Sequence, residues 1–406
     1  MASDRLSGLR ILVLGAGASH EPAFVTWARH GCRTTLVDGG ESEGYEPLAD
    51  DFLAEEVYDH LHPDVDRLAG VAARHDVVLT LSDMAQATAA EVAERAGLRG
   101  TGVRAARLAR DKHLQRAAAE RAGLPVARSV PVARGDGIDA LDLPVPPPGV
   151  VKPVDAGGSA AVSLVRTRAE LAAACARAVA QSFSGRCVVE EYLAGTEWSI
   201  EALVVDGQVR FTSHTAKTLV GPDCFIERRH VVGAEPGPVE MAAVDELTHR
   251  MVELFEVQTA LCHLEVRLDE ARATPIEMAV RPAGDGIVDL VRLARGRDLY
   301  AELVAALADR EPGPPRAPVA PLAGTEFLIA TGTVRRTPSP ASVVGSAPGI
   351  RYAVTKAHVG QTLGAVDANW RRAGRAVATG ESVVELERSL TAAMEAMAAE
   401  MGVTRR

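Results

Sequence analysis

Two alternating runs of residues around position 270 constrain the fold of this chain most. The run from His263 to Leu268 and the run from Ile276 to Arg281 each place an apolar side chain at every second position, with a polar turn between them. A period of two is typical of β-strands, so the pattern predicts a β-hairpin. Its pairing would set Glu265 beside Glu277 on one face of the hairpin.

The two glutamates predict a metal site. Like charges at this separation repel strongly in a low dielectric, and a divalent cation relieves that repulsion. Carboxylate oxygens are the ligands that Mg²⁺ takes in proteins, with substrate phosphates completing its coordination. We therefore expect Glu265 and Glu277 to bind Mg²⁺, or Mn²⁺ in its place. The alternative is a solvated polar face on an ordinary hairpin.

The segments upstream point to phosphate binding. Residues 149–153 form an apolar predicted strand that contains Lys152, and a glycine-rich loop follows at residues 155–159. Glycines let backbone N–H groups approach phosphate oxygens closely. A further predicted strand over residues 187–193 then leads into the run from Thr196 to Glu201.

The order of these segments resembles that of the ATP-grasp superfamily, over roughly residues 106–310. The resemblance implies two lysines on the ATP phosphates, a glycine-rich flap, a hinge that binds adenine, and a glutamate that holds the ribose hydroxyls. The residues at these positions are Lys112 and Lys152 for the phosphates, Gly157, Gly158 and Ser159 in the flap, Glu190, Glu191 and Leu193 in the hinge, and Glu197 for the ribose.

One position departs from the pattern of many ATP-grasp enzymes. They carry Glu-x-Asn at the second metal position, with the asparagine as a further ligand, whereas this chain has Glu277-Met278-Ala279. The Glu-x-Ala-x-Arg pattern that ends at Arg281 is similar to that of the bacterial L-amino-acid ligases. The alternative is an inactive site that only binds nucleotide.

The resemblance to the amino-acid ligases implies further site residues. Lys217, Glu227 and His230 correspond to residues near the two substrates of those enzymes. The guanidinium of Arg281 matches what an acyl phosphate and its tetrahedral adduct require, so we expect it to stabilise the oxyanion. Arg281, Lys152 and His230 make up the predicted catalytic set.

Gly284 and Asp285 are expected to line the substrate pocket. A buried carboxylate favours an ammonium or guanidinium partner. Our hypothesis from the sequence is therefore a larger or positively charged amine-bearing substrate. The alternative is a solvated aspartate in a glycine-rich turn.

These assignments predict an ATP- and Mg²⁺-dependent carboxylate–amine ligase. A carboxylate, expected to be that of an amino acid, would attack the γ-phosphorus of ATP, and an amine would convert the acyl phosphate into a peptide or amide. The resemblance implies release of ADP and phosphate, and a role in natural-product or antibiotic biosynthesis. The alternatives are a ligase with a non-amino-acid amine or a carrier-bound acceptor, and a catalytically dead nucleotide-binding regulator.

The N-terminal segment offers a competing function. A strand predicted over residues 10–14 leads to Gly15 and Gly17, and Asp38 ends a second strand about twenty residues further on, which resembles a dinucleotide-binding fingerprint. His20 occupies the third glycine position and weakens the match. An NAD-linked enzyme is thus a further alternative, although ATP-grasp ligases commonly begin with such a βα domain.

The fold class we expect is α/β (α+β) and multidomain. A Rossmann-like domain would cover residues 1–105, and a small C-terminal subdomain would cover residues 312–406. The ATP-grasp core between them would span residues 106–311, with a small lobe at about 115–192 and a large lobe at about 193–311.

Composition excludes several classes of partner. The 44 basic and 54 acidic residues give a net charge of −10, which argues against nucleic acid. The five cysteines show neither metal-ligand spacing nor a paired framework, and no apolar run reaches the roughly 20 residues of a membrane span. We expect a cytoplasmic enzyme of small molecules, for which a homodimer is a reasonable state.

Overall fold

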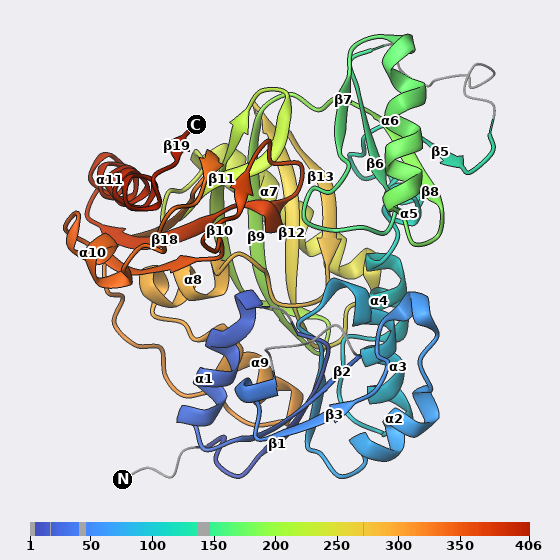
Figure 1. Cartoon of the computed structure of the whole chain (residues 1–406). Coiled ribbons are helices and arrows are strands. Elements are labelled where there is room, and N and C mark those ends of the chain that lie inside the picture. The colour runs from blue at the N-terminus through green and yellow to red at the C-terminus, as the bar shows by residue number, and fades with distance from the viewer. Residues whose placement is uncertain (1–4, 17, 40–45, 137–146, 271) are drawn as a thin grey trace.

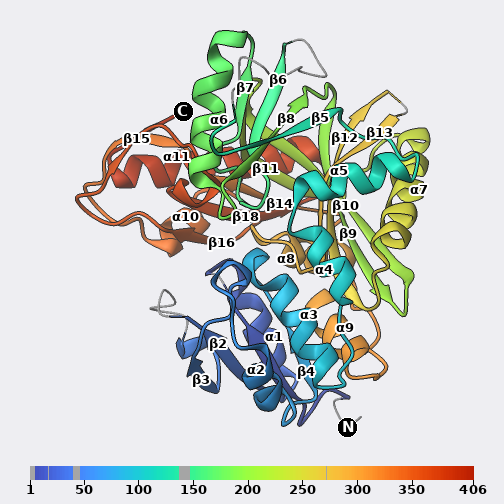
Figure 2. The same ribbon diagram turned by 90° about the vertical axis from the view of Figure 1, so that its right-hand side faces the viewer.

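The computed structural model describes residues 5–16, 18–39, 46–136, 147–270 and 272–406. Four sheets and the helices packed on them make up a mixed α/β fold, which confirms the predicted fold class. Figures 1 and 2 show a parallel sheet at one end of the molecule, a large antiparallel sheet in the middle, and a smaller antiparallel sheet that projects beside it.

The N-terminal sheet has four parallel strands in the order β3-β2-β1-β4. Every residue of its strand β1 after Arg10 is buried, which fits a strand covered on both faces. The strands are β1 (Arg10–Leu14), β2 (Arg33–Asp38), β3 (Asp51–Ala54) and β4 (Val77–Leu79), and the helices are α1 (Glu21–Arg29), α2 (Val65–Ala72) and α3 (Gln86–Arg95).

This sheet shares one hydrophobic core with α8 (Ile287–Arg295) and α9 (Leu299–Leu307). Trp27 of α1 is fully buried, and its ring meets that of Tyr300 edge-on with the centroids 6.3 Å apart. The Trp27 indole Nε1 also donates a hydrogen bond of 3.1 Å to the Tyr300 carbonyl. Helices α8 and α9, which follow the N-terminal sheet by about 200 residues in sequence, therefore fix this sheet to the rest of the molecule.

Two helices, α4 (Val103–Ala109) and α5 (Lys112–Arg121), lead into the small antiparallel sheet. The Asp111 carboxylate caps α5 by accepting a 3.0 Å hydrogen bond from the Leu114 N–H, so Lys112 stands at the first turn of the helix. The sheet has the order β5-β8-β6-β7, and α6 (Arg168–Gln181) covers one face (Figure 2). Its strands are β5 (Ser129–Ala133), β6 (Gly149–Pro153), β7 (Ser163–Val165) and β8 (Arg186–Glu191).

The large sheet has eight strands in the order β13-β12-β9-β10-β11-β14-β18-β16. Its edge contains the predicted hairpin, which is confirmed: β12 and β13 are antiparallel, and Glu265 pairs directly with Glu277. The strands are β9 (Thr196–Val205), β10 (Gln208–Gly221), β11 (Cys224–Val232), β12 (Ala260–Asp269), β13 (Arg272–Ala279), β14 (Leu322–Phe327), β16 (Ile350–Thr355) and β18 (Gly374–Gly380).

Helices cover this large sheet. The apolar face of α7 (Pro238–Phe255) packs against β9 and β12, while α10 (Pro340–Gly345) and α11 (Val383–Met401) pack on β14, β16 and β18. The remaining small sheet contains β15 (Ala330–Thr333), β17 (Thr362–Leu363) and β19 (Thr404–Arg405). Within the described part of the chain, no helix is both long and apolar enough to cross a membrane.

Candidate active site

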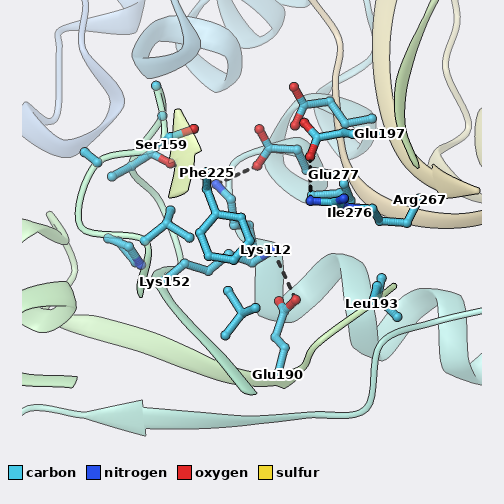
Figure 3. A pocket seen from close by; sticks show the side chains of 18 of the residues that line it. Lys112, Lys152, Ser159, Glu190, Leu193, Glu197, Phe225, Arg267, Ile276 and Glu277 are labelled. Carbon is cyan, nitrogen blue, oxygen red and sulfur yellow. Dashed lines mark hydrogen bonds and ion pairs between the residues drawn. The ribbon is translucent and has the colours of Figure 1, made fainter. Parts of the chain in front are cut away.

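A cleft with about 760 Å³ of space, part of it open to solvent, lies between the small antiparallel sheet and the β12–β13 hairpin (Figure 3). The walls of the cleft contain every residue predicted to bind nucleotide or metal, namely Lys112, Lys152, Gly157, Gly158, Ser159, Glu190, Glu191, Leu193, Glu197, Glu265 and Glu277. Segments distant in the sequence thus meet in one place, although the roles of these residues stay predictions.

Each carboxylate of the predicted metal pair contacts a lysine. Lys217 forms a close ion pair with Glu265, and the Lys112 Nζ lies 2.7 Å from Glu277 Oε2. The Lys112 ammonium also donates a 2.8 Å hydrogen bond to the carbonyl of Ala156 in the glycine-rich loop. The two glutamates can face each other because an ammonium group neutralises each of them.

Lys217 lies among three carboxylates. Its Nζ is 3.7 Å from Glu197 and 3.5 Å from Glu227, in addition to the ion pair with Glu265. Burial opposes the charge of the ammonium, but these carboxylates, Glu265 foremost, raise the pKa of Lys217. Lys217 therefore carries a permanent positive charge beside the cleft.

The donor set at this place suits a hard divalent cation. Among the described residues, ligand oxygens of Glu197, Glu227 and Glu265 lie within 4.8 Å of one another, close enough to share one ion. Glu277 faces Glu265 from the neighbouring strand, outside this group of three, and the Lys217 ammonium lies among the three carboxylates. All of these donors are oxygens, as Mg²⁺ requires, so the residues present fit the predicted metal.

His263 connects Glu265 to a carboxylate behind it. Its Nδ1 lies 2.9 Å from Glu201 Oε1, and its Nε2 lies 3.3 Å from Glu265 Oε1. Burial lowers the pKa of His263, but Glu201 and Glu265 outweigh burial and raise it to about 9. A charged imidazole thus orients Glu265. The sequence carried a signal for this contact, because His263 stands two residues before Glu265 on the same strand face.

Glu190 is shared by two cations. Lys152 Nζ lies 3.1 Å from Oε2 of this glutamate, and Arg116 Nη2 lies 3.0 Å from Oε1. Burial favours a neutral glutamate, but the two cations lower the pKa of Glu190, while burial lowers that of Lys152. The second hinge glutamate, Glu191, accepts hydrogen bonds of 3.0 Å from the backbone N–H and Nε of Arg128. Both hinge carboxylates are therefore engaged within the chain.

The predicted ribose glutamate, Glu197, also has a partner that was not predicted from the sequence. Arg267 Nη2 lies 3.0 Å from Glu197 Oε2, and Arg267 Nη1 donates a 3.0 Å hydrogen bond to the Gly195 carbonyl (Figure 3). The alternation of β12 offered a signal here too, since Arg267 follows Glu265 by two residues. Phe225 of β11 completes this side of the cleft.

The glycine-rich loop lies between residues of the N-terminal part of the chain and residues of its C-terminal part. The Asn369 N–H donates a 2.9 Å hydrogen bond to the Gly158 carbonyl, and a Cβ atom at Gly158 would lie 2.8 Å from the ring of Trp370. A Cβ atom at Gly157 would lie 3.1 Å from a carboxylate oxygen of Asp83. Gly158 also has a φ of +61°, so glycine is required here twice, by backbone conformation and by space.

Arg281 lies outside the cleft, just after the end of β13 at Ala279. Its Nε and Nη2 donate hydrogen bonds of 2.8 and 2.5 Å to the two carboxylate oxygens of Asp83. Burial would raise the pKa of Asp83, but the guanidinium outweighs it, and the pKa falls to about 2. The predicted oxyanion residue is thus held by a bidentate ion pair at the flap, next to Gly157.

Of the predicted substrate residues, Lys217 and Glu227 lie at the cleft, whereas His230, Gly284 and Asp285 form a separate cluster. His230 Nε2 lies 3.3 Å from one carboxylate oxygen of Asp285, and Arg372 Nη2 donates a 2.6 Å hydrogen bond to the other. The Arg372 Cζ also sits 3.5 Å above the ring centroid of Phe327. Gly284 begins the turn before α8, where its carbonyl accepts a 3.1 Å hydrogen bond from the Ile287 N–H.

Asp285 therefore differs from both expectations about it. Burial would raise its pKa, but Arg372 and His230 hold that pKa well below the usual range, so the carboxylate is charged. Its side chain is 24% exposed, and it is not free for a substrate cation, because Arg372 already supplies the guanidinium partner. The hypothesis of a positively charged substrate loses its main support.

The acidic residue of the N-terminal fingerprint is also occupied. Asp38 is fully buried, and it accepts hydrogen bonds of 2.6 Å from the Tyr58 hydroxyl and 3.3 Å from the Ala16 N–H. Burial raises its pKa. A ribose of NAD would have to displace these contacts. Gly17, the second glycine of the fingerprint, lies outside the described residues.

Comparisons with curated proteins identify ligases. The chain is 34% identical over 163 residues to a D-alanine–D-alanine ligase of Anaeromyxobacter sp. (strain Fw109-5), a match that covers 37% of this chain and 51% of that protein. It is 26% identical over 300 residues to the alanine–anticapsin ligase of Bacillus subtilis, covering 66% of this chain and 63% of that protein. The chain thus spans less than two thirds of the length of each of these relatives.

Comparison with solved structures extends the likeness to the whole fold. The L-amino acid ligase from Bacillus licheniformis superposes with a TM-score of 0.79 at 19% identity, covering 96% of this chain and 98% of that one. At this identity the likeness shows the fold alone. Residues 145–289, which contribute most of the cleft, match the family model described as the ATP-grasp domain. The chain therefore contains an ATP-grasp domain, as the order of its motifs predicts.

Proposed function

We propose that this protein is an ATP-dependent ligase that joins a carboxylate to an amine through an acyl phosphate. The observation that carries the proposal is the cleft itself, in which two lysines, a glycine-rich loop and the opposed pair Glu265 and Glu277 line one space. The names of the relatives, D-alanine–D-alanine ligase and alanine–anticapsin ligase, support the same reaction class. By analogy with them, we propose amino acids as substrates and a small peptide or amide of natural-product biosynthesis as the product.

Lys112 and Lys152 would bind the phosphates of ATP in the first step. Both ammonium groups point toward the cleft, where Glu277 and Glu190 hold them (Figure 3). A bound Mg²⁺, held by Glu265 and Glu277, would neutralise the phosphate oxygens during transfer. The oxygen of the donor carboxylate forms a bond to the γ-phosphorus, and the bond from that phosphorus to the β-phosphate oxygen breaks, which releases ADP. The loop at Gly157 and Gly158 would exclude water from the acyl phosphate.

His230 and Arg281 would act in the second step. The amine attacks the acyl carbon, the carbon–oxygen bond to phosphate breaks, and the amine loses a proton. Burial lowers the pKa of His230, which favours the neutral imidazole. With Nε2 toward Asp285, the Nδ1 atom has no hydrogen-bond partner in the part of the chain that the structure describes. We propose that Nδ1 accepts this proton, and that Arg281 stabilises the oxyanion after the flap region has closed on substrate.

The test is product analysis with the purified protein. ATP, Mg²⁺ and pooled amino acids should yield ADP, phosphate and a product whose mass equals two substrates less water. Hydroxylamine added in place of the amine should trap the acyl phosphate as a hydroxamate. AMP as the nucleotide product would refute the acyl-phosphate step. ATP binding with no turnover on any substrate pool would instead favour a nucleotide-binding regulator, as Ala279 in place of asparagine would allow.

A further inference from the structure

A second cavity lies on the other side of the glycine-rich loop. It has about 1,090 Å³ of space, part of it open to solvent, and its walls come from the β16–β17 connection and from the short helix η6 (Asn369–Arg371) with the residues that follow it. Trp370 lines this cavity and also rests on Gly158 of the loop. Arg372 lines it and binds Asp285 beside His230. The cavity therefore adjoins the proposed reaction centre from the C-terminal side.

The walls of this cavity carry positive charge. Lys356, Arg371 and Arg372 line it, and none of the described residues in its walls has a carboxylate. Arg371 is paired with Asp367 at 3.1 Å, and Arg372 is paired with Asp285. For Lys356, the structure shows no ion pair within the residues that it describes.

Lys356 faces a net positive environment. Of the charged groups that act on it, Asp285 attracts the ammonium, whereas Arg372 and Arg375 repel it. Arg375 in turn donates a 2.6 Å hydrogen bond to the Asp285 carbonyl. Arg372 and Arg375 thus both bind Asp285, and Arg372 already neutralises its carboxylate. An anion in the cavity would balance the remaining charge.

The use of lysine in this chain singles out the same residue. Of 44 cationic side chains, 40 are arginines and only four are lysines, namely Lys112, Lys152, Lys217 and Lys356. Two of the four line the ATP-grasp cleft, and a third lies directly beside it on Glu265. Three of the four lysines are thus at the ATP-grasp cleft, where each pairs with a carboxylate. Among the four lysines, Lys356 alone neither lines that cleft nor forms an ion pair with a described residue of its walls.

We propose that this cavity binds the carboxylate of the amine-bearing substrate, with Lys356 as its counter-ion. The proposal rests on the ligase function above and names the class of acceptor: an amine that also carries a carboxylate, such as an amino acid, in preference to an amide or a simple amine. The acceptor carboxylate lies toward Lys356, and its amine lies toward His230 and the acyl phosphate. Trp370 packs against the apolar part of the acceptor and links its binding to the position of the loop.

Acceptor kinetics test the proposal. Lys356→Gln should raise the KM for an amino-acid acceptor about tenfold or more, since one charge-assisted contact is lost, and Lys356→Arg should recover part of the loss. The corresponding amino-acid amide should be a poor acceptor whose KM does not change with Lys356→Gln. Arg388→Gln, which removes an exposed charge on α11, serves as the control with unchanged kinetics. Equal KM values in the parent and Lys356→Gln, or equal use of acid and amide by the parent, would overturn the proposal.

Hydroxylamine separates this proposal from the ligase function. It traps the acyl phosphate without an acceptor carboxylate, so hydroxamate formation and the KM of the donor should be the same in Lys356→Gln and the parent. A raised donor KM would assign the cavity to the donor and reject the acceptor role. If no donor gives a hydroxamate, the ligase proposal fails. Calorimetric titration of amino acids and their amides into the ADP-loaded protein would then still test whether the cavity binds a carboxylate. If an amino acid binds equally well to the parent and to Lys356→Gln, the role of Lys356 as counter-ion is contradicted.

Discussion

At the level of single side chains, the two carboxylates of the predicted metal pair are held differently. Glu265 contacts both Lys217 and His263, and its side chain is 15% exposed. Glu277 contacts Lys112 alone among the described cations, and its side chain is 29% exposed. Burial would raise the pKa of Glu265, but Lys217 and His263 hold it well below the usual range. Glu277 is therefore the carboxylate that an incoming metal ion reaches more easily.

Replacing Glu277 by glutamine should weaken metal binding and turnover together. The variant keeps the size of the side chain but loses a charged oxygen ligand, and we expect about a hundredfold fall in ATP turnover, equivalent to roughly 3 kcal/mol of transition-state stabilisation. Titration of the Mg²⁺ requirement measures the effect. Asp269→Asn, an exposed change on the same hairpin, should leave the requirement unaltered. A normal metal requirement in Glu277→Gln would remove Glu277 from the site.

The charge on His263 predicts a pH dependence of stability. Its pKa is raised to about 9 in the folded protein, against about 6.5 for a free histidine, so the stabilisation is fully present below pH 6.5 and is lost as the pH rises through 9. We expect His263→Gln to cost about 2–3 kcal/mol at pH 6 and less at each higher pH. Melting curves from pH 6 to pH 10, recorded without divalent ions, measure this difference.

His249→Gln, which changes an exposed histidine on α7, provides the control for that series. Its melting temperature should stay close to that of the parent protein at every pH. A gap between His263→Gln and the parent that is constant from pH 6 to pH 10 would show that His263 is not charged in the folded protein.

At the level of elements, the glycine-rich loop depends on a contact with the C-terminal part of the chain. Gly158→Ala should displace the loop, because a Cβ atom would meet the Trp370 ring at 2.8 Å and the φ of +61° costs about 1 kcal/mol for alanine. We expect more ADP formed per molecule of product, since water reaches the acyl phosphate. The ratio of ADP to condensation product measures this loss of coupling.

Two further variants interpret that result. Gly221→Ala should leave the ratio of ADP to product unchanged, because a Cβ atom at Gly221 would have no neighbour within 4 Å. Adding Trp370→Ala to Gly158→Ala removes the clash and should restore part of the coupling. If the double variant is no better than Gly158→Ala alone, the strain lies in the backbone and not in the contact with Trp370.

Elements that follow from local alternation could be read from the sequence. The β12–β13 hairpin and the strand β6 around Lys152 each depend on a pattern within a few residues. Periodicity also set Glu265 opposite Glu277. Arg281 is the exception: the alternation continues to it, but β13 ends two residues earlier, where the chain turns toward Asp83.

Contacts between distant segments could not be predicted in this way. Asp83 meets Arg281 across 198 positions, and Arg372 meets Asp285 across 87. Arg116 reaches Glu190 across 74. No local pattern marks these partners, because a charged residue in a helix or loop reads as an ordinary solvated side chain. The occupied state of Asp285 was missed for this reason.

At the level of the whole molecule, the boundaries predicted at residues 105 and 311 are crossed by packing. The eight-stranded sheet takes β14, β16 and β18 from beyond residue 311, and α9 shares the core of the N-terminal sheet. Helix and strand patterns give the elements but not the sheet that each strand joins. The domain limits therefore stay predictions. Hydrophobic cores and a sheet that cross these limits hold the predicted domains together.

A substitution of Trp27 tests whether the N-terminal sheet and α9 share one core. Trp27→Ala should destabilise the protein by about 3–5 kcal/mol, because a fully buried side chain and its hydrogen bond to Tyr300 are lost. Thermal unfolding should begin earlier and separate into two transitions, as the N-terminal sheet comes away from α9. Val25→Ala on the same helix, where the side chain is 38% exposed, should change stability by less than about 0.5 kcal/mol. A single unshifted transition in Trp27→Ala would contradict the shared core.

The scarcity of lysine gives the protein an unusual chemical reactivity. The side chains of Lys112, Lys152 and Lys217 are at most 14% exposed, whereas Lys356 lies open on the wall of the second cavity. A reagent that acylates amines would therefore meet one accessible lysine side chain in the whole chain. A fluorophore attached there would sit beside Trp370 and the glycine-rich loop, and would report on loop closure without any engineered attachment point.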